Sequence, residues 1–378
     1  MKIVIAIDSF KGSLTSIEAG KAAVDGISRV YPQAEISVYP LADGGEGTTE
    51  ALVSGLGGVL RTVNVCDPLG RNVSAKYGIL PDNTAVIEMA SAAGLTLLTK
   101  DERNPLHTTT FGVGQMIADA VSQGCRNFII GIGGSATNDG GIGCLQALGF
   151  GMLDSDEKQV DLGAKGVSQL EKITSDNVIP ELSECTFSIA CDVNNPLCGE
   201  NGCSAVFAPQ KGADKAMITE MDGYLSKYAE LTKRYNTNAN PEAHGAGAAG
   251  GLGFAFMSYL NAVLEPGIDL ILRKTRIEDA VRNADIVITG EGCLDAQTAM
   301  GKAPVGVAKL AKKYGKPVIA FSGIIRDGAE LSNENGINAY FPILRSICTQ
   351  EEAMNPDFAR MNLADTAQQV FRLIRIFS

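Results

Sequence analysis

The sequence predicts an α/β protein: a doubly wound, mostly parallel Rossmann- or flavodoxin-like domain that is interrupted by a second, smaller mixed α/β domain. Short β-branched runs recur along the chain, and each is followed by a glycine-rich or acidic turn and then by a helical pattern. The chain has 378 residues, of which 45% are hydrophobic, and this is enough for roughly two domains of the usual size.

The predicted strands of the parallel sheet are residues 3–7, 36–39, 127–130, 285–289, 317–321 and 339–344. After the first strand, Thr15-Ser-Ile-Glu18 matches a capping box and predicts a helix that continues through residues 19–30. Two regions break this rhythm. Residues 62–90 alternate between polar and apolar, which indicates antiparallel hairpins. Residues 151–240 carry a polar loop, a strand at Thr186–Ala190 and a helix near 214–233.

The domain boundaries that follow are discontinuous. We expect residues 1–61, 105–150 and 246–378 in the Rossmann-like domain, residues 62–104 and 151–245 in the inserted domain, and the active site in the cleft between them.

Composition excludes several classes of protein. The net charge of −11 and the lack of a Lys/Arg-rich stretch argue against a nucleic-acid partner. The 22 uncharged residues between Glu242 and Glu265 include five glycines and polar side chains, so we interpret them as a buried helix and not as a membrane span. Nine cysteines without C-x-x-C spacing indicate reduced thiols in a cytoplasm. The only two histidines lack partners at zinc-ligand spacing.

The stretch GIGGSATNDGG at 131–141 follows a predicted strand and indicates an anion-binding loop, because glycines let backbone N–H groups converge on a ligand. We expect the helix that follows to aim its positive end at the same anion. The alternative is a tight strand-to-helix turn that needs positive φ.

Four other segments share this mixture of glycine with acidic, amide or hydroxyl side chains. Since strand ends converge at one edge of an open sheet, we expect several of these turns to form one site. The segments are 8–13, 42–48, 192–197 running on to 209–212, and 289–298 with Gly301-Lys302.

The residue types in these turns point to phosphoryl transfer. Carboxylates beside glycines suit Mg²⁺, and lysines beside glycines suit phosphate oxygens. Each residue also has a structural alternative, since an aspartate after a strand is often a helix cap and a lysine is often a solvated surface charge. The carboxylates are Asp8, Asp43, Glu46, Asp139, Asp192, Glu291 and Asp295, and the lysines are Lys11, Lys211 and Lys302.

Standard nucleotide motifs are missing. Gly301-Lys302 is followed by Ala303, so no Walker P-loop is present. The stretch Gly245-Ala-Gly-Ala-Ala-Gly250 matches G-x-G-x-x-G, but it follows polar residues and not a buried strand, and we interpret it as a helix start whose glycines allow close packing or approach to an anion. The protein-kinase motifs and a G-x-S-x-G elbow are also absent.

Seven motifs in order resemble those of the bacterial glycerate kinases: DSFKGS at 8–13, ADGGEGT at 42–48, the stretch at 131–141, CDVNNPL at 191–197, FAPQKGA at 207–213, GAGAAGGLG at 245–253 and ITGEGCLDAQT at 288–298. The resemblance implies two α/β domains, one inserted into the other, and an enzyme without a P-loop that phosphorylates D-glycerate from ATP with Mg²⁺. The family usually has a basic residue where this chain has Cys293. Arg71, Arg276 or Lys302 are candidates to replace it.

On this hypothesis the product is 2-phosphoglycerate, with 3-phosphoglycerate as the alternative. Asp192 is the candidate base that orients the substrate hydroxyl, Asp8 is its competitor, and Lys11 completes the catalytic set. The candidate Mg²⁺ ligands are Asp43, Glu46, Glu291 and Asp295. The candidates that bind substrate or phosphate are Ser9, Ser13, Gly133, Gly134, Ser135, Asn138, Asn195, Lys211, Gly247, Gln297 and Lys302.

Three alternatives remain open: a kinase of another small hydroxy acid, a non-catalytic sensor of a sugar acid or nucleotide, and an oxidoreductase that uses the glycine turn at 245–250. The expected partners are the small molecules ATP and D-glycerate, without nucleic acid or membrane. The sequence leaves a homodimer open.

Overall fold

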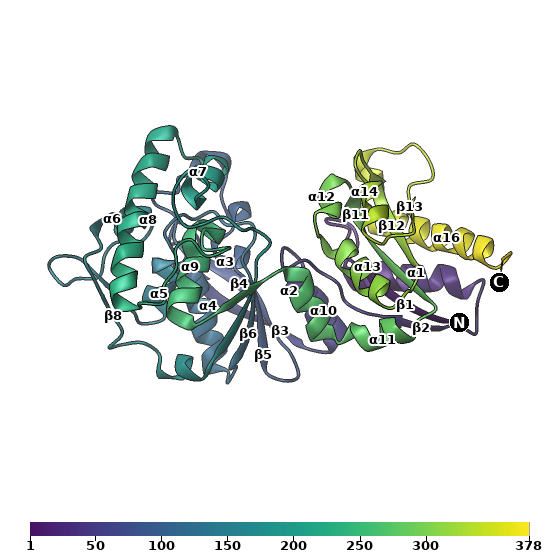
Figure 1. Ribbon diagram of the computed structural model, residues 1–378, viewed down its shortest axis with the longest axis horizontal. Helices are drawn as coiled ribbons and strands as arrows, with labels where there is room; N and C mark the ends of the chain where they lie inside the picture. The colour runs from purple at the N-terminus through teal and green to yellow at the C-terminus, as the bar shows by residue number, and fades with distance from the viewer. Residues whose placement is uncertain (378) are drawn as a thin grey trace. The chain divides into compact units, whose positions relative to one another are not determined.

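A computed structural model describes residues 1–377 and divides the chain into two compact units (Figure 1). Unit 1 consists of Met1–Asp43, Glu50–Gly57 and the chain from Ile268 onward. Unit 2 consists of Gly44–Thr49 and Gly58–Gly267. Each unit is described by itself below.

Unit 1 is built on a five-stranded parallel sheet with the order β13-β12-β11-β1-β2. Numbered along the unit, this order is 2-1-3-4-5, that of flavodoxin-like folds, and it reverses between β1 and β11. Four of its strands contain β-branched residues, whereas β13 reads Ala-Tyr-Phe-Pro. The bounds are β1 (Lys2–Ile7), β2 (Glu35–Val38), β11 (Ile286–Leu294), β12 (Val318–Ile325) and β13 (Ala339–Pro342).

Helices cover both faces of this sheet (Figure 1). Successive side chains of a strand point to opposite faces, and here the side chains on both faces are apolar. Ile3, Ile5 and Ile7 pack with helices α1 (Ser16–Ser28) and α16 (Pro356–Ile374). Val4 and Ala6 pack with α11 (Ile277–Asn283) and α13 (Ala303–Lys313). The capping box predicted at the start of α1 is present. The remaining helices of this unit are α2 (Thr48–Leu56), α10 (Gly267–Thr275), α12 (Ala296–Ala299), α14 (Leu331–Glu334) and α15 (Gln350–Met354).

Unit 2 contains a six-stranded sheet with the order β10-β9-β6-β5-β4-β3. Its parallel part is formed by β5 (Thr84–Glu88), β6 (Asn127–Gly131), β9 (Thr186–Ala190) and β10 (Val263–Glu265). The antiparallel part adds β3 (Val59–Cys66) and β4 (Asn72–Ile79), as the alternation in residues 62–90 predicts. A separate antiparallel pair joins β7 (Gly151–Leu153) to β8 (Lys172–Thr174).

One apolar core unites the helices and the large sheet of unit 2, with Tyr77, Phe128, Tyr228 and Phe254 among its fully buried members. The helices are α3 (Ala90–Ala93), α4 (Phe111–Ser122), α5 (Ile142–Ala147), α6 (Ala164–Gln169), α7 (Cys203–Phe207), α8 (Lys215–Tyr235) and α9 (Ala248–Leu260). Residues 248–260 of the uncharged window form the buried helix α9, which is kinked at residues 249–251, whereas Val263 and Leu264 at the end of the window belong to β10. Among the helices of residues 1–377, none is long and apolar enough to span a membrane.

The α/β class is confirmed, but the domain boundaries expected from the sequence differ from the observed units. Residues 105–150 and 246–267 belong to unit 2 and not to the flavodoxin-like unit. The reason is strand pairing: β6 lies between β5 and β9, so the segment that contains it cannot join the sheet of unit 1. Unit 2, expected to be the smaller, is the larger of the two.

Candidate functional site

A pocket with polar and apolar lining forms in unit 1 at the carboxyl ends of β1 and β11, where the strand order reverses. Ligands of open α/β sheets bind at such switch points because the loops of adjacent strands there leave in opposite directions. The structure brings many of the predicted residues to this pocket: Asp8, Ser9, Lys11, Ser13, Asp43, Glu291 and Lys302.

Asp8 is the most perturbed carboxyl group of this pocket. Its side chain is buried directly after β1, and its Oδ1 accepts a hydrogen bond of 2.6 Å from the Ser9 N–H. Burial, followed by the negative charges of Asp43 and Glu291, raises its pKa to about 7. Burial also raises the pKa of Glu291, although its Oε1 accepts from Thr298 Oγ1 at 2.6 Å. A cation at this pocket would relieve the repulsion between these carboxylates.

The donor set fits Mg²⁺ that arrives with phosphate oxygens. Within residues 1–377, no three histidine, cysteine, aspartate or glutamate side chains lie close enough together to hold a metal ion by themselves. Mg²⁺ commonly takes only one or two carboxylates and completes its shell with phosphate oxygens and waters. Asp8, Asp43 and Glu291 can supply such carboxylates.

The other two predicted metal ligands lie elsewhere. Asp295 is the N-cap of α12, where its Oδ1 accepts from the N–H groups of Gln297 (2.9 Å) and Thr298 (3.2 Å). Asp295 and Gln297 border a neighbouring depression with Arg326, and Lys302 Nζ lies 3.9 Å from Asp295 Oδ1. Glu46 belongs to unit 2, and its side chain is exposed.

The glycine loop of unit 2, residues 131–141, follows β6 and is built around a buried lysine. Lys211 is 1% exposed, and its Nζ donates to Ser135 Oγ at 2.8 Å and to the Thr137 carbonyl at 2.6 Å. Both acceptors are uncharged. Burial therefore lowers the pKa of Lys211 to about 8. Gly133 and Gly134 are exposed beside Ser135, so an anion there would gain the ammonium charge together with backbone donors.

Buried hydrogen bonds hold the rest of the loop. Asp139 is fully buried, and its Oδ2 accepts from Thr110 N (2.8 Å) and Thr110 Oγ1 (2.9 Å). Its Oδ1 accepts from Gly141 N at 3.1 Å. The expectation that the next helix aims its positive end at a ligand is wrong, because α5 has six residues and Asp139 already bonds the N–H of its N-cap. Asn138 is buried as well and donates to Ser204 Oγ at 2.9 Å.

The turn after β9 carries Asp192. Its side chain is exposed, and its Oδ1 accepts from Gly267 N at 3.0 Å. Asn195 Nδ2 donates to the Asn201 carbonyl at 2.9 Å, and the Asn195 carbonyl accepts from Gly247 N at 2.9 Å. These contacts hold the shape of the turn.

Close packing explains the glycines at 245–250. A Cβ on Gly247 would lie 2.2 Å from the Pro196 carbonyl oxygen. A Cβ on Gly250, whose φ is +66°, would lie 2.1 Å from the Thr137 carbonyl oxygen. The interpretation of this stretch as a closely packed helix start is confirmed, because these glycines let α9 approach the loop that holds Lys211.

Known proteins are similar to this chain over nearly its whole length. The sequence profile of the glycerate kinase family matches residues 3–375. The chain belongs to the glycerate kinase family. It is 45% identical over 375 residues to a glycerate kinase of Haemophilus influenzae, covering 99% of both chains. It is 46% identical over 354 residues to a glycerate 2-kinase of Escherichia coli, covering 93% of both chains.

A solved structure agrees with the fold of this family member. A crystal structure assigned to glycerate kinase 2 from Salmonella typhimurium LT2 matches with a TM-score of 0.91 at 42% identity, over 100% of this chain and 98% of that one. The protein is therefore an enzyme of the kinase class with the α/β architecture of its family.

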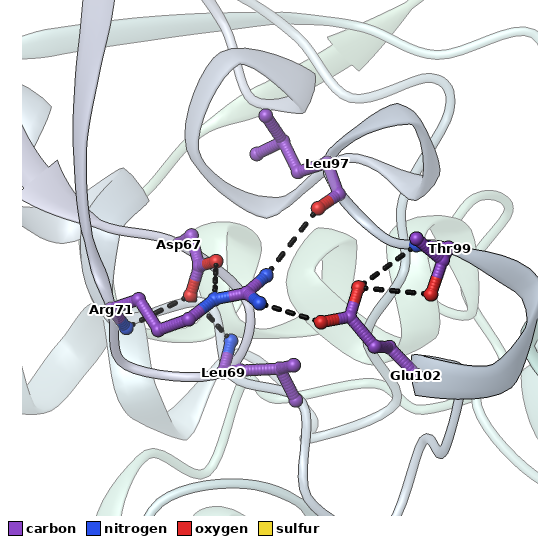
Figure 2. A network of polar contacts seen from close by, with 6 residues as sticks. All are labelled: Asp67, Leu69, Arg71, Leu97, Thr99 and Glu102. Carbon is purple, nitrogen blue, oxygen red and sulfur yellow. Dashed lines mark hydrogen bonds and ion pairs between the residues drawn. The ribbon is translucent and has the colours of Figure 1, made fainter.

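Cys293 of this kinase lines the unit 1 pocket, at the position where the family usually has a basic residue. The structure shows which of the candidate basic residues lie near it. Arg71 is engaged in unit 2, where its guanidinium pairs with Asp67 and Glu102, each at 2.6 Å (Figure 2). Lys302 lines the same pocket as Cys293. Sequence reasoning missed Arg326, whose charge opposes the rise in the pKa of the Cys293 thiol that burial causes. Arg326 follows β12, which pairs with the strand that carries Cys293, but the strand predicted there ended at residue 321, so no sequence signal pointed to Arg326.

Sequence reasoning also missed the apolar wall of the pocket. Ile324, Ile343, Leu344 and Met354 line it beside the polar residues. Apolar side chains carry no motif for a site, so only the fold could place them there.

Proposed function

We propose that this kinase transfers the γ-phosphate of ATP to a hydroxyl group of D-glycerate and releases 2-phosphoglycerate. The observation that carries the proposal is the match of residues 3–375 to the glycerate kinase family. The E. coli relative named glycerate 2-kinase supports the 2-hydroxyl as acceptor. Attack by the other hydroxyl would give 3-phosphoglycerate.

Asp192 and Asp8 are the two candidate bases. A base accepts the proton of the attacking hydroxyl while the new O–P bond forms and the bond to the leaving ADP breaks. Asp192 is an exposed carboxylate oriented by the Gly267 N–H, which suits contact with a substrate that enters from solvent. Asp8 has a pKa of about 7, which suits proton transfer near neutral pH.

The charged and polar residues of each unit suit different parts of the substrates. Lys211, Ser135 and the amides of Gly133 and Gly134 suit the carboxylate of glycerate or a phosphate. Lys11 and Lys302, with Ser9 and Ser13, suit the phosphates of ATP. When bound, Mg²⁺ would neutralise charge on the phosphate oxygens, and Asp43 and Glu291 would hold it.

Turnover with defined substrates tests the proposal. Purified protein with ATP, Mg²⁺ and D-glycerate should release ADP, and L-glycerate and a reaction without acceptor serve as controls. Phosphorus NMR identifies the product as the 2- or the 3-phosphate. ADP release that does not depend on D-glycerate, followed by activity with another small hydroxy acid, would replace the acceptor in the proposal. A homodimer, a cytoplasmic location and a reaction between the two domains stay predictions.

A further inference from the structure

The pocket of unit 1 is lined by a polar part and an apolar part. Its volume is about 300 Å³, at the lower end of the range for small-molecule sites. One part of its lining is polar, with Asp8, Asp43, Glu291, Lys11 and Lys302. The other part is apolar, with Phe10, Ile324, Ile343, Leu344 and Met354.

The apolar part is partly exposed to water. Ile324 is 46% exposed and Met354 is 37% exposed, whereas Phe10 and Ile343 form a buried backing behind them. A ligand that covered Ile324 and Met354 would be stabilised because their apolar surface would be removed from water.

Two glycines on adjacent strands also line the pocket. Gly292 and Gly323 lie between the paired residues Glu291–Ser322 and Cys293–Ile324. A Cβ on Gly323 would lie 2.6 Å from the Gly292 carbonyl oxygen, and a Cβ on Gly292 would lie 3.4 Å from the Phe10 Cα. These glycines therefore allow the backbone segments beside the pocket to pack closely.

The polar part offers groups for an anion. Lys11 and Lys302 bring positive charge to the wall of the cavity. Ser13 Oγ is buried there and has no hydrogen-bond partner within the described chain. A buried hydroxyl without a partner is costly, and a ligand oxygen would satisfy it.

We propose that this pocket binds the nucleoside part of ATP, with the base against Ile324 and Met354 and the phosphates toward Lys11, Lys302 and Ser13. The inference rests on the proposed function for the identity of the nucleotide. Glycerate does not fit the requirement, because it is small and polar throughout and would leave the apolar wall in water. The acceptor is then left to the glycine loop and Lys211 of unit 2.

Cys293 supplies a direct probe because its half-buried thiol lines the pocket. The full-length protein is treated with N-ethylmaleimide, and alkylation of each cysteine is followed by peptide mass spectrometry. Cys185 is the matched control, since it is also half-buried, its thiol pKa is also raised by burial, and it lies in unit 2. We expect Mg²⁺-ADP to slow alkylation of Cys293 at least fivefold, adenosine alone to slow it as well, and neither to affect Cys185.

Two outcomes would overturn the inference: unchanged alkylation of Cys293 at saturating ADP, or protection by inorganic tripolyphosphate with none by adenosine. D-glycerate should protect neither cysteine. If ADP protects Cys293 but D-glycerate-dependent turnover is absent, the proposed acceptor is wrong and the nucleoside pocket stands. If turnover is present and ADP gives no protection, the pocket assignment alone is wrong.

A pair of variants tests the apolar wall by kinetics. Ile324→Glu places a charge on the wall, and Ile347→Glu makes the same change at a fully exposed isoleucine that does not line the pocket. We expect Ile324→Glu to raise KM for ATP at least tenfold with KM for D-glycerate within twofold, and Ile347→Glu to change neither. An effect of Ile324→Glu on KM for D-glycerate alone would contradict the assignment.

Discussion

Within residues 1–377, each unit buries an ionisable side chain that has no opposite charge among its hydrogen-bond partners, and these two groups, Asp8 in unit 1 and Lys211 in unit 2, have opposite charge. In unit 1, burial and neighbouring carboxylates raise the pKa of Asp8 to about 7. In unit 2, burial lowers the pKa of Lys211 to about 8. Each group is thus driven toward its neutral form, and each lacks an opposite charge in its immediate hydrogen bonds.

This difference teaches what each unit requires from a ligand. A cation near Asp8 restores its charged form, and an anion near Ser135 restores that of Lys211. A substrate pair made of metal-bound nucleotide and an acid supplies both charges. The two sites are therefore complementary to the two halves of the proposed reaction.

The largest effect is expected from the two candidate bases. Asp8→Asn and Asp192→Asn each remove a proton acceptor at nearly constant volume, and loss of the true base should lower kcat by roughly 10²–10⁴-fold. Steady-state kinetics with ATP and D-glycerate measures this. Asp176→Asn, at an exposed carboxylate that lines neither pocket, is the control. If both variants keep kcat within a few-fold of wild type, neither residue is the base.

Lys211→Met tests the basic half of the comparison. Methionine keeps the apolar stem and removes the charge that faces Ser135, so kcat/KM for D-glycerate should fall by roughly 10²–10³-fold with KM for ATP little changed. The substrate dependence of the rate at saturating ATP measures it. A fall confined to KM for ATP would assign the glycine loop to the nucleotide and reverse the roles of the two units.

Gly250→Ala tests whether the packing that holds the Lys211 loop is rigid. The new Cβ would lie 2.1 Å from the Thr137 carbonyl oxygen at a residue with φ of +66°. We expect a loss of unfolding free energy of about 3–4 kcal/mol, measured by guanidinium denaturation. Gly124→Ala is the matched control, with φ of +85° and nothing within 4 Å, and it should cost only about 1–2 kcal/mol. Equal losses in the two variants would show that the Thr137 carbonyl can move away from the new Cβ, so that the packing there is not rigid.

The pH dependence of stability gives a further test of Lys211. Its pKa is about 8 in the folded chain and ordinarily 10.5, so between these values the unfolded chain binds more protons and the free energy of unfolding rises with pH. Relative to Lys211→Met, wild type should gain about 3 kcal/mol from pH 7 to pH 10.5. Denaturation of both proteins across this range measures the difference, in which thiols and tyrosines cancel. A difference that does not change with pH would mean that the ammonium is solvated.

Much of the fold could be predicted because its signals are local. β-branched runs and the capping box at Thr15 mark strands and a helix start, and alternation marks the hairpins of residues 62–90. The domain boundaries were not predictable in this way. Which sheet the strand β6 joins depends on pairing with β5 and β9, a contact between segments far apart in the chain.

The candidate site also contains residues with a local sequence signal and residues that only contacts between distant segments bring there. Polar residues beside glycines predicted Asp8, Glu291 and Lys211 as candidate site residues, because this pattern is local in the sequence. The same pattern could not distinguish Asp139 from Asp8. The side chain of Asp139 accepts hydrogen bonds from Thr110, which is distant in the sequence, and these bonds hold the loop. Arg326 and Ile324 reach the site only because β12 pairs with β11.

The smallest effect is expected from Arg71, the cation outside both sites. Its guanidinium is about half exposed and spans Asp67, Glu102 and the Leu97 carbonyl (Figure 2). Arg71→Ala leaves the buried carboxylate of Asp67 without its ion-pair partner but with its hydrogen bonds from the N–H groups of Leu69 and residue 71, so it should cost about 1–2 kcal/mol of unfolding free energy and leave kcat/KM for D-glycerate within twofold. Denaturation and steady-state kinetics on the same preparation check both. A tenfold loss of kcat/KM at unchanged stability would mean that Arg71 leaves its carboxylates to hold a substrate anion, and Lys211 would then share its role in unit 2.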